Sequence, residues 1–202
     1  MRAFPPWRRA LPVLLGVQGL LGTLALAWGL ARDLRWWERV SPGPEVLAGL
    51  AAGLALSHLS NAIFRELSRR GVAGTRWLLD DFLGPLFQGL PPAWVLGLSL
   101  LSGVCEEAFF RGALQAELGL WASSLLFGLL HTGDRRLLLA GAWSAAVGLG
   151  LGLSYEGTGN LAVPMAVHGA NNLLSFWQLS RWQPGGPGAP DGTPGQDRGT
   201  RS

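Results

Sequence analysis

Residues 92–113 read PAWVLGLSLLSGVCEEAFFRGA, an apolar run of membrane-spanning length that contains Glu106, Glu107 and Arg111. A helix that crosses a bilayer needs about 20 mainly apolar residues. Ionisable side chains inside such a helix are expensive, at about 2.5–3.5 kcal/mol for Arg or Asp on insertion scales, and they mark functional positions. The stretch therefore predicts a transmembrane helix with a polar site at membrane depth.

Further apolar runs lie on both sides of this stretch. Together they give expected spans at 11–31, 45–64, 92–113, 118–131, 136–155 and 160–179. Residues 77–90 are apolar but interrupted by charged residues, Gly and Pro, which favours an interfacial or re-entrant segment. Hydrophobic residues make up 49% of the chain and charged residues 14%, against about 25% charged in a typical soluble domain. The sequence predicts an all-α, multi-pass transmembrane helical bundle of about six to seven spans.

The runs divide the chain into three expected parts. Residues 1–91 form N-terminal transmembrane helices with the interfacial segment, and residues 92–180 form the core that carries the polar site. Residues 181–202 are polar and rich in Pro and Gly, a composition that predicts a disordered tail.

The arginines predict the orientation in the cell membrane, because basic residues favour the cytoplasmic side. With six spans and a cytoplasmic N-terminus, only Arg32, Arg35 and Arg39 would lie outside, and Arg111 would stay within the membrane. Both termini are therefore expected in the cytoplasm. The net charge of +3 does not indicate a nucleic-acid partner, because the arginines gather at the ends of the apolar runs.

Helical spacing separates the three charged residues of the central run. Glu107 and Arg111 are four apart, so they share a helix face and are expected to pair. Glu106 lies about 100° around the helix and is left to face another partner. At about 1.5 Å of rise per residue, Glu106 lies roughly 15 Å, His131 roughly 20 Å and His168 roughly 12 Å from the outer surface, so the three can meet near mid-membrane.

A carboxylate and two imidazoles in a dry cavity are suited to two chemistries. Glu106 and His131 can hold and deprotonate a water, while His168 and Asn172 donate to the oxyanion that forms when this water attacks a carbonyl. Alternatively, Glu106, His131 and His168 can hold a divalent metal such as zinc, with an open position for water. The residues alone leave both chemistries open.

Three motifs in this order resemble those of the CPBP family, the CAAX proteases and bacteriocin-processing membrane peptidases. They are Glu106-Glu107-Ala-Phe-Phe-Arg111 for EExxxR, Phe127-Gly-Leu-Leu-His131 for FxxxH, and His168-Gly-Ala-Asn-Asn172 for HxxxN. Each motif alone is weak, but three in order, each inside an expected span, are specific. The resemblance covers about residues 92–178, and residues 1–91 show no matching pattern.

This resemblance implies an intramembrane endopeptidase similar to prenyl-protein CAAX endopeptidases. The implied partner is a membrane-anchored protein or peptide substrate, prenylated or CAAX-like, held in the lipid bilayer. The implied site comprises a base, Glu106, assisted by His131; oxyanion donors, His168 and Asn172; and a supporting pair, Glu107 and Arg111. The family also carries the label of metalloprotease, so a glutamate mechanism and a metal mechanism both remain open.

Alternative interpretations concern both residues and function. Cys105 is a weaker candidate for a nucleophile, and His58 with Asn61 is expected to form a local polar contact. Asn171 is expected to lie outside the site. A non-catalytic membrane scaffold or bacteriocin-immunity factor of the same fold is the alternative function. A transporter ranks below it, because the outer halves of the helices are apolar and offer no polar path across the membrane.

Overall fold

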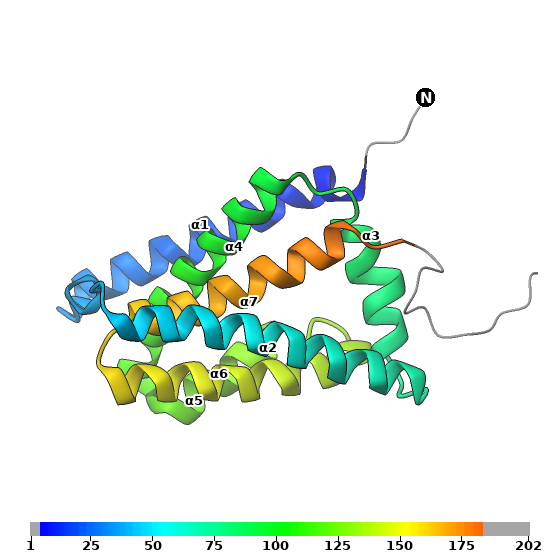
Figure 1. Ribbon diagram of the computed structural model, residues 1–202. Coiled ribbons are helices and arrows are strands. Elements are labelled where there is room, and N and C mark those ends of the chain that lie inside the picture. The colour runs from blue at the N-terminus through cyan, green and yellow to red at the C-terminus, as the bar shows by residue number, and fades with distance from the viewer. Residues whose placement is uncertain (1–4, 184–202) are drawn as a thin grey trace, which may run out of the picture.

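The computed structural model describes residues 5–183, whose regular structure is entirely helical (Figure 1). The long helices are α1 (Pro6–Ala31), α2 (Pro44–Arg69), α4 (Pro92–Glu107), α5 (Gln115–Leu130), α6 (Leu138–Thr158) and α7 (Ala162–Ser180). The short ones are η1 (Trp36–Arg39), η2 (Trp77–Leu83), α3 (Gly84–Phe87), η3 (Ala108–Leu114) and η4 (Arg135–Leu137). The all-α class is confirmed. The disorder expected for the tail beyond residue 183 lies outside the described residues.

Four helical segments within residues 5–183 are long and apolar enough to cross a membrane. These are Pro6–Ala31, Pro44–Arg69, Pro92–Leu130 and Arg135–Thr158. They agree with a multi-pass membrane protein, but the expected count of six to seven spans is not confirmed. Two of the expected spans join in one 39-residue helical segment, which bends at Gly119, where φ is 78°. α7 falls outside the set because its polar side chains lower its mean hydropathy.

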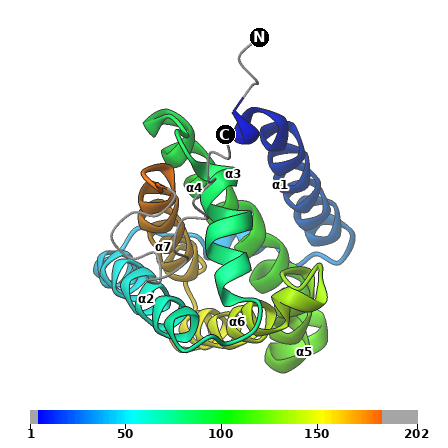
Figure 2. The same cartoon turned by 90° about the vertical axis from the view of Figure 1, so that its right-hand side faces the viewer.

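The segment that was expected at the interface, residues 77–90, forms η2 and α3 and is not among the candidate spans. Figure 2 shows this segment running across one end of the bundle. It contacts α1, α7 and η4, and the Arg136 guanidinium lies 5.1 Å from the centre of the Trp77 ring. η2 and α3 therefore cover the end of the bundle at which α2 and α7 finish.

α7 packs between α2 and α4 (Figure 1). Small residues permit this close packing. A Cβ at Gly103 of α4 would lie 2.9 Å from the backbone nitrogen of Gly169, and a Cβ at Gly53 of α2 would strike the carbonyl of Val167. Backbones that approach this closely are typical of helix packing in membranes. The tight packing brings the inner faces of α4 and α7 together.

The helix that begins as α4 widens into a π-helical turn, η3, directly after Glu106 and Glu107. All seven residues of η3 are buried. Short π-helical stretches inside α-helices frequently occur at functional sites. Here the turn lies between the two carboxylates and α5, and it contains Arg111, so it determines where the charged groups of this helix point.

Candidate active site

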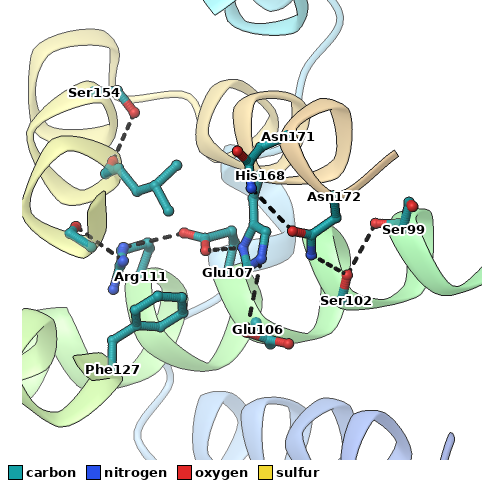
Figure 3. A network of polar contacts seen from close by, with 12 residues as sticks. Ser99, Ser102, Glu106, Glu107, Arg111, Phe127, Ser154, His168, Asn171 and Asn172 are labelled. Carbon is teal, nitrogen blue, oxygen red and sulfur yellow. Dashed lines mark hydrogen bonds and ion pairs between the residues drawn. The ribbon is translucent and has the colours of Figure 1, made fainter. Parts of the chain in front are cut away.

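The two glutamates at the end of α4 have separate partners, as their spacing predicts. Glu107 is fully buried, with an exposed fraction of 0%. Its Oε2 lies 3.2 Å from Nε of Arg111, which is also 0% exposed, and its Oε1 lies 2.7 Å from Nδ1 of His168 (Figure 3). The expected pairing of Glu107 with Arg111 is observed. Glu107 also has a second role that spacing did not indicate, because it holds an imidazole of α7.

The buried guanidinium of Arg111 is held from three directions. Its Nη2 donates to the carbonyl of Gly148 in α6 at 3.0 Å, and its Cζ lies 5.3 Å from the centre of the Phe127 ring. The contact with Glu107 is an ion pair and not a well-aligned hydrogen bond, and Nη1 has no hydrogen-bond partner among the described residues. Gly148 permits this arrangement, since a Cβ there would lie 3.3 Å from Nη2.

His168 connects the two glutamates. Its Nδ1 is hydrogen-bonded to Glu107, and its Nε2 lies 3.9 Å from Oε2 of Glu106. A distance of this size is too long for a direct hydrogen bond and is suited to a bridging water. Both Glu106 and His168 are buried. The predicted meeting of the α4 carboxylate with the α7 imidazole is therefore observed.

The other oxygen of Glu106 is held by a residue that the sequence did not single out. Gln18 of α1 donates from Nε2 to Oε1 of Glu106 at 2.7 Å, and Gln18 is itself buried. One signal was available in the sequence. Gln18 is an isolated amide inside the apolar run 11–31, where a polar side chain is unfavourable unless it has a partner.

Asn172 lies one helical turn after His168 and faces α4. Its Nδ2 donates to Oγ of Ser102 at 2.8 Å, and its Oδ1 accepts from Nδ2 of Asn171 at 3.1 Å (Figure 3). Ser102 precedes Glu106 by four residues, so the row of polar groups continues along both helices. Asn171, which was expected outside the site, therefore contacts a candidate site residue directly.

His131 lies apart from the two glutamates. Its Nδ1 is 2.7 Å from the carbonyl oxygen of Phe127, and no residue in the described part of the chain contacts its Nε2. The Phe127 ring packs against both imidazoles, with its centre 4.5 Å from that of His131 and 5.8 Å from that of His168. His131 is thus connected to the buried cluster through an aromatic ring, and among the described residues it forms no hydrogen bond or ion pair with Glu106.

A cavity of about 680 Å³ adjoins the cluster on the side of His131 and Asn171. It lies between the C-terminal halves of α2 and α7, η2 and the start of α6. Its lining mixes apolar groups with hydroxyl, amide and charged groups, among them Arg65 and Asp80. Glu106 and His168 do not line it, so the cavity reaches the acid–imidazole cluster only at its edge.

The metal set considered from the sequence, Glu106, His131 and His168, does not come together. Within residues 5–183 there is no group of three or more His, Cys, Asp or Glu residues placed to hold a metal ion. Nδ1 of His168 is already engaged by Glu107, so only Nε2 of this ring faces Glu106. The donor arrangement therefore does not fit a zinc site, and the expectation of a metalloprotease is not supported.

Part of this chain is similar to known proteins. Residues 88–174 match the family described as Type II CAAX prenyl endopeptidase Rce1-like. A Bacillus subtilis (strain 168) protein described as uncharacterized protein YpbD is 45% identical over 74 residues, which are 37% of this chain and 39% of the relative. No solved structure matches the chain. Residues 88–174 therefore form an Rce1-like domain of the type II CAAX prenyl endopeptidase (CPBP) family.

Proposed function

We propose that this protein is an intramembrane endopeptidase that cleaves membrane-anchored proteins, with prenylated, CAAX-type chains as its substrate class. One observation carries the proposal. The Glu106 carboxylate faces the Nε2 atom of His168 across 3.9 Å, inside a helical bundle that has four candidate membrane spans. A carboxylate and an imidazole at this separation can hold a water for attack on a carbonyl. The matching family consists of hydrolases of this kind.

The balance of charges in the site supports a proton on both nitrogens of His168. Glu107 and Arg111 neutralise each other, which leaves the Glu106 carboxylate as an uncompensated charge in a buried site. Buried charge is strongly disfavoured unless it is paired. A doubly protonated His168 removes the imbalance. It donates from Nδ1 to Glu107 and directs its Nε2–H toward the water and Glu106.

The reaction then follows from this arrangement. The water oxygen attacks the substrate carbonyl carbon while Glu106 takes one of its protons. The carbonyl oxygen becomes an oxyanion, which Nε2–H of His168 and the free N–H of Asn172 stabilise. When the C–N bond breaks, Glu106 returns the proton to the departing amine. The products are a new carboxyl group and a new amine, so atoms and charges balance.

His131 fits the role of an assisting base at the edge of this centre. Its Nδ1–H donates to the carbonyl of Phe127, so in the neutral ring Nε2 is an acceptor. That nitrogen can accept a proton on the cavity side of the site but cannot stabilise an oxyanion. We therefore assign His131 to proton transfer with Glu106, and we assign oxyanion stabilisation to His168 and Asn172.

Cleavage of a defined peptide tests the proposal. A farnesylated peptide that ends in three residues after its modified Cys should be cut by the purified protein in detergent or in vesicles. Mass spectrometry should detect the released tripeptide and the shortened, farnesylated product. A peptide of the same sequence without the farnesyl group should be cut more slowly, because it does not partition into the bilayer.

Treatment with a metal chelator supplies a second arm of this test. Cleavage should continue unchanged, because the described residues offer no three-ligand metal group. If no lipidated or transmembrane peptide is cleaved under any condition, the proposed function is wrong. If a chelator abolishes cleavage and added zinc restores it, the glutamate mechanism is wrong.

Blocking the cavity should weaken substrate binding. Ala140 of α6 lines the cavity of about 680 Å³, and the indole of Ala140→Trp would project into it and narrow it. We expect KM to rise about 10-fold, the equivalent of about 1.4 kcal/mol of lost binding. Ala142→Trp is the matched control, because Ala142 is exposed on the same helix and does not line the cavity. Equal KM values for the two variants would exclude this cavity as the place where substrate binds.

A further inference from the structure

We infer that Gln18 of α1 is a positioning residue for the proposed base, and that α1 thereby completes a site whose other groups lie within residues 88–174. This inference rests on the proposed function. Gln18 is 8% exposed, and its Nε2 donates to Oε1 of Glu106 at 2.7 Å. Residue 18 lies far outside the matched region. The matched motifs therefore do not contain every group that touches the reactive carboxylate.

The inner face of α1 is built to bring this amide close to α4. Gln18, Gly22, Ala25 and Gly29 follow one another at helical spacing, and Gln18, Ala25 and Gly29 are buried. A Cβ at Gly22 would lie 3.1 Å from Sγ of Cys105, the residue before Glu106. Because the positions that follow Gln18 along this face are small, the helices approach closely enough for Gln18 to reach Glu106.

The hydrogen bond determines which oxygen of Glu106 faces His168. With Oε1 held by Gln18, Oε2 is the oxygen that lies 3.9 Å from Nε2 of His168. Without Gln18, the carboxylate can rotate about its last torsion and approach the imidazole directly. Such a direct ion pair would occupy the place of the bridging water. Gln18 therefore keeps the base and the imidazole apart at the separation that one water requires.

A purely structural role at position 18 would be filled better by an apolar side chain than by the amide of Gln18. Its Oε1 atom is buried and has no hydrogen-bond partner within residues 5–183. A buried polar atom without a partner is unfavourable, and an apolar side chain of the same length would avoid that penalty. Exchange of Gln18 for Met removes this penalty but also leaves Oε1 of Glu106 without its donor, so the two effects on stability oppose each other. Catalysis should therefore be affected while the stability of the fold changes little, which separates positioning from packing.

The experiment measures kinetics and stability for the same variants of the full chain. For Gln18→Met we expect kcat to fall about 10- to 100-fold, as for the loss of a hydrogen bond to a charged group. KM should stay within about twofold and the thermal midpoint should change little. Thr23→Val is the matched control, because Thr23 also lies on α1 and its hydroxyl donates to the carbonyl of Gly19 in the same helix. It should behave as wild type.

A double-mutant cycle tests the contact independently of activity. The shift in thermal midpoint caused by Gln18→Met should differ between the wild-type background and a Glu106→Leu background, because the two side chains interact directly. Additive shifts would overturn the inference, as would unchanged kcat or a change confined to KM. If the wild-type protein cleaves nothing, the proposed function fails first. In that case the cycle still reports whether the amide and the carboxylate are coupled.

Discussion

Replacement of Glu106 by Gln is expected to lower kcat by roughly 10³-fold, within the range typical of the loss of a general base. Gln has the same shape as Glu, and its amide oxygen can still accept the hydrogen bond from Gln18. It cannot take a proton from the water that faces His168. Because Gln keeps the shape of Glu and the hydrogen bond from Gln18, the variant should fold and insert as the wild type does.

The measurement is a rate of tripeptide release, made alongside a thermal midpoint in the same detergent. Glu117→Gln is the control, since it makes the same chemical change in the same helical segment. Glu117 pairs with Arg32, whose side chain is 61% exposed, so this loss should alter neither rate nor stability appreciably. A Glu106→Gln protein that retains more than a tenth of wild-type activity would exclude Glu106 as the base.

The features predicted correctly from sequence follow from local properties of the chain, namely residue spacing and apolar runs. The pairing of Glu107 with Arg111 follows from the i, i+4 neighbourhood on one helix. Glu106, which points about 100° away from Glu107 around the helix, was expected to face a different element. It faces the imidazole of His168 on α7. The all-α class followed from long apolar runs, which in a bilayer can only be helices or closed barrels. Spacing within a helix is set by backbone geometry alone, so it can be read without a structure.

The features that sequence did not predict depend on which helices are neighbours. Gln18 reaches Glu106 across 88 positions of the chain, and nothing in the spacing of α1 indicates that α4 lies beside it. His131 follows Phe127 by four residues, but the Phe127 ring lies against both imidazoles, which spacing could not show. The expected count of six to seven spans is not confirmed, and α7, which carries polar side chains of the site, is not among the four candidate spans of the described residues.

The Glu107–Arg111 pair links the helices that form the candidate site. Glu107 holds Nδ1 of His168, and Arg111 ties Glu107 to the backbone of Gly148 in α6. Two fully buried charged side chains therefore connect α4, α6 and α7. A variant that removes one charge should have the largest effect on stability of any single change in this region.

Arg111→Met is accordingly expected to destabilise the protein by about 3–5 kcal/mol, because it leaves the Glu107 carboxylate buried without its cation. The thermal midpoint in detergent should fall steeply, and activity should be lost with it. Arg32→Met is the control, since it also breaks an ion pair with a glutamate, but one whose Arg is 61% exposed and contributes less than about 1 kcal/mol.

The double variant Glu107→Leu with Arg111→Met separates stability from chemistry. Removal of both charges leaves no unpaired ion, so most of the lost stability should return. Activity should not return, because Nδ1 of His168 then has no carboxylate to hold the ring toward Glu106. A double variant that regains both stability and activity would show that the pair is only structural. One that remains unstable would show that the pair stabilises the bundle more than apolar packing can.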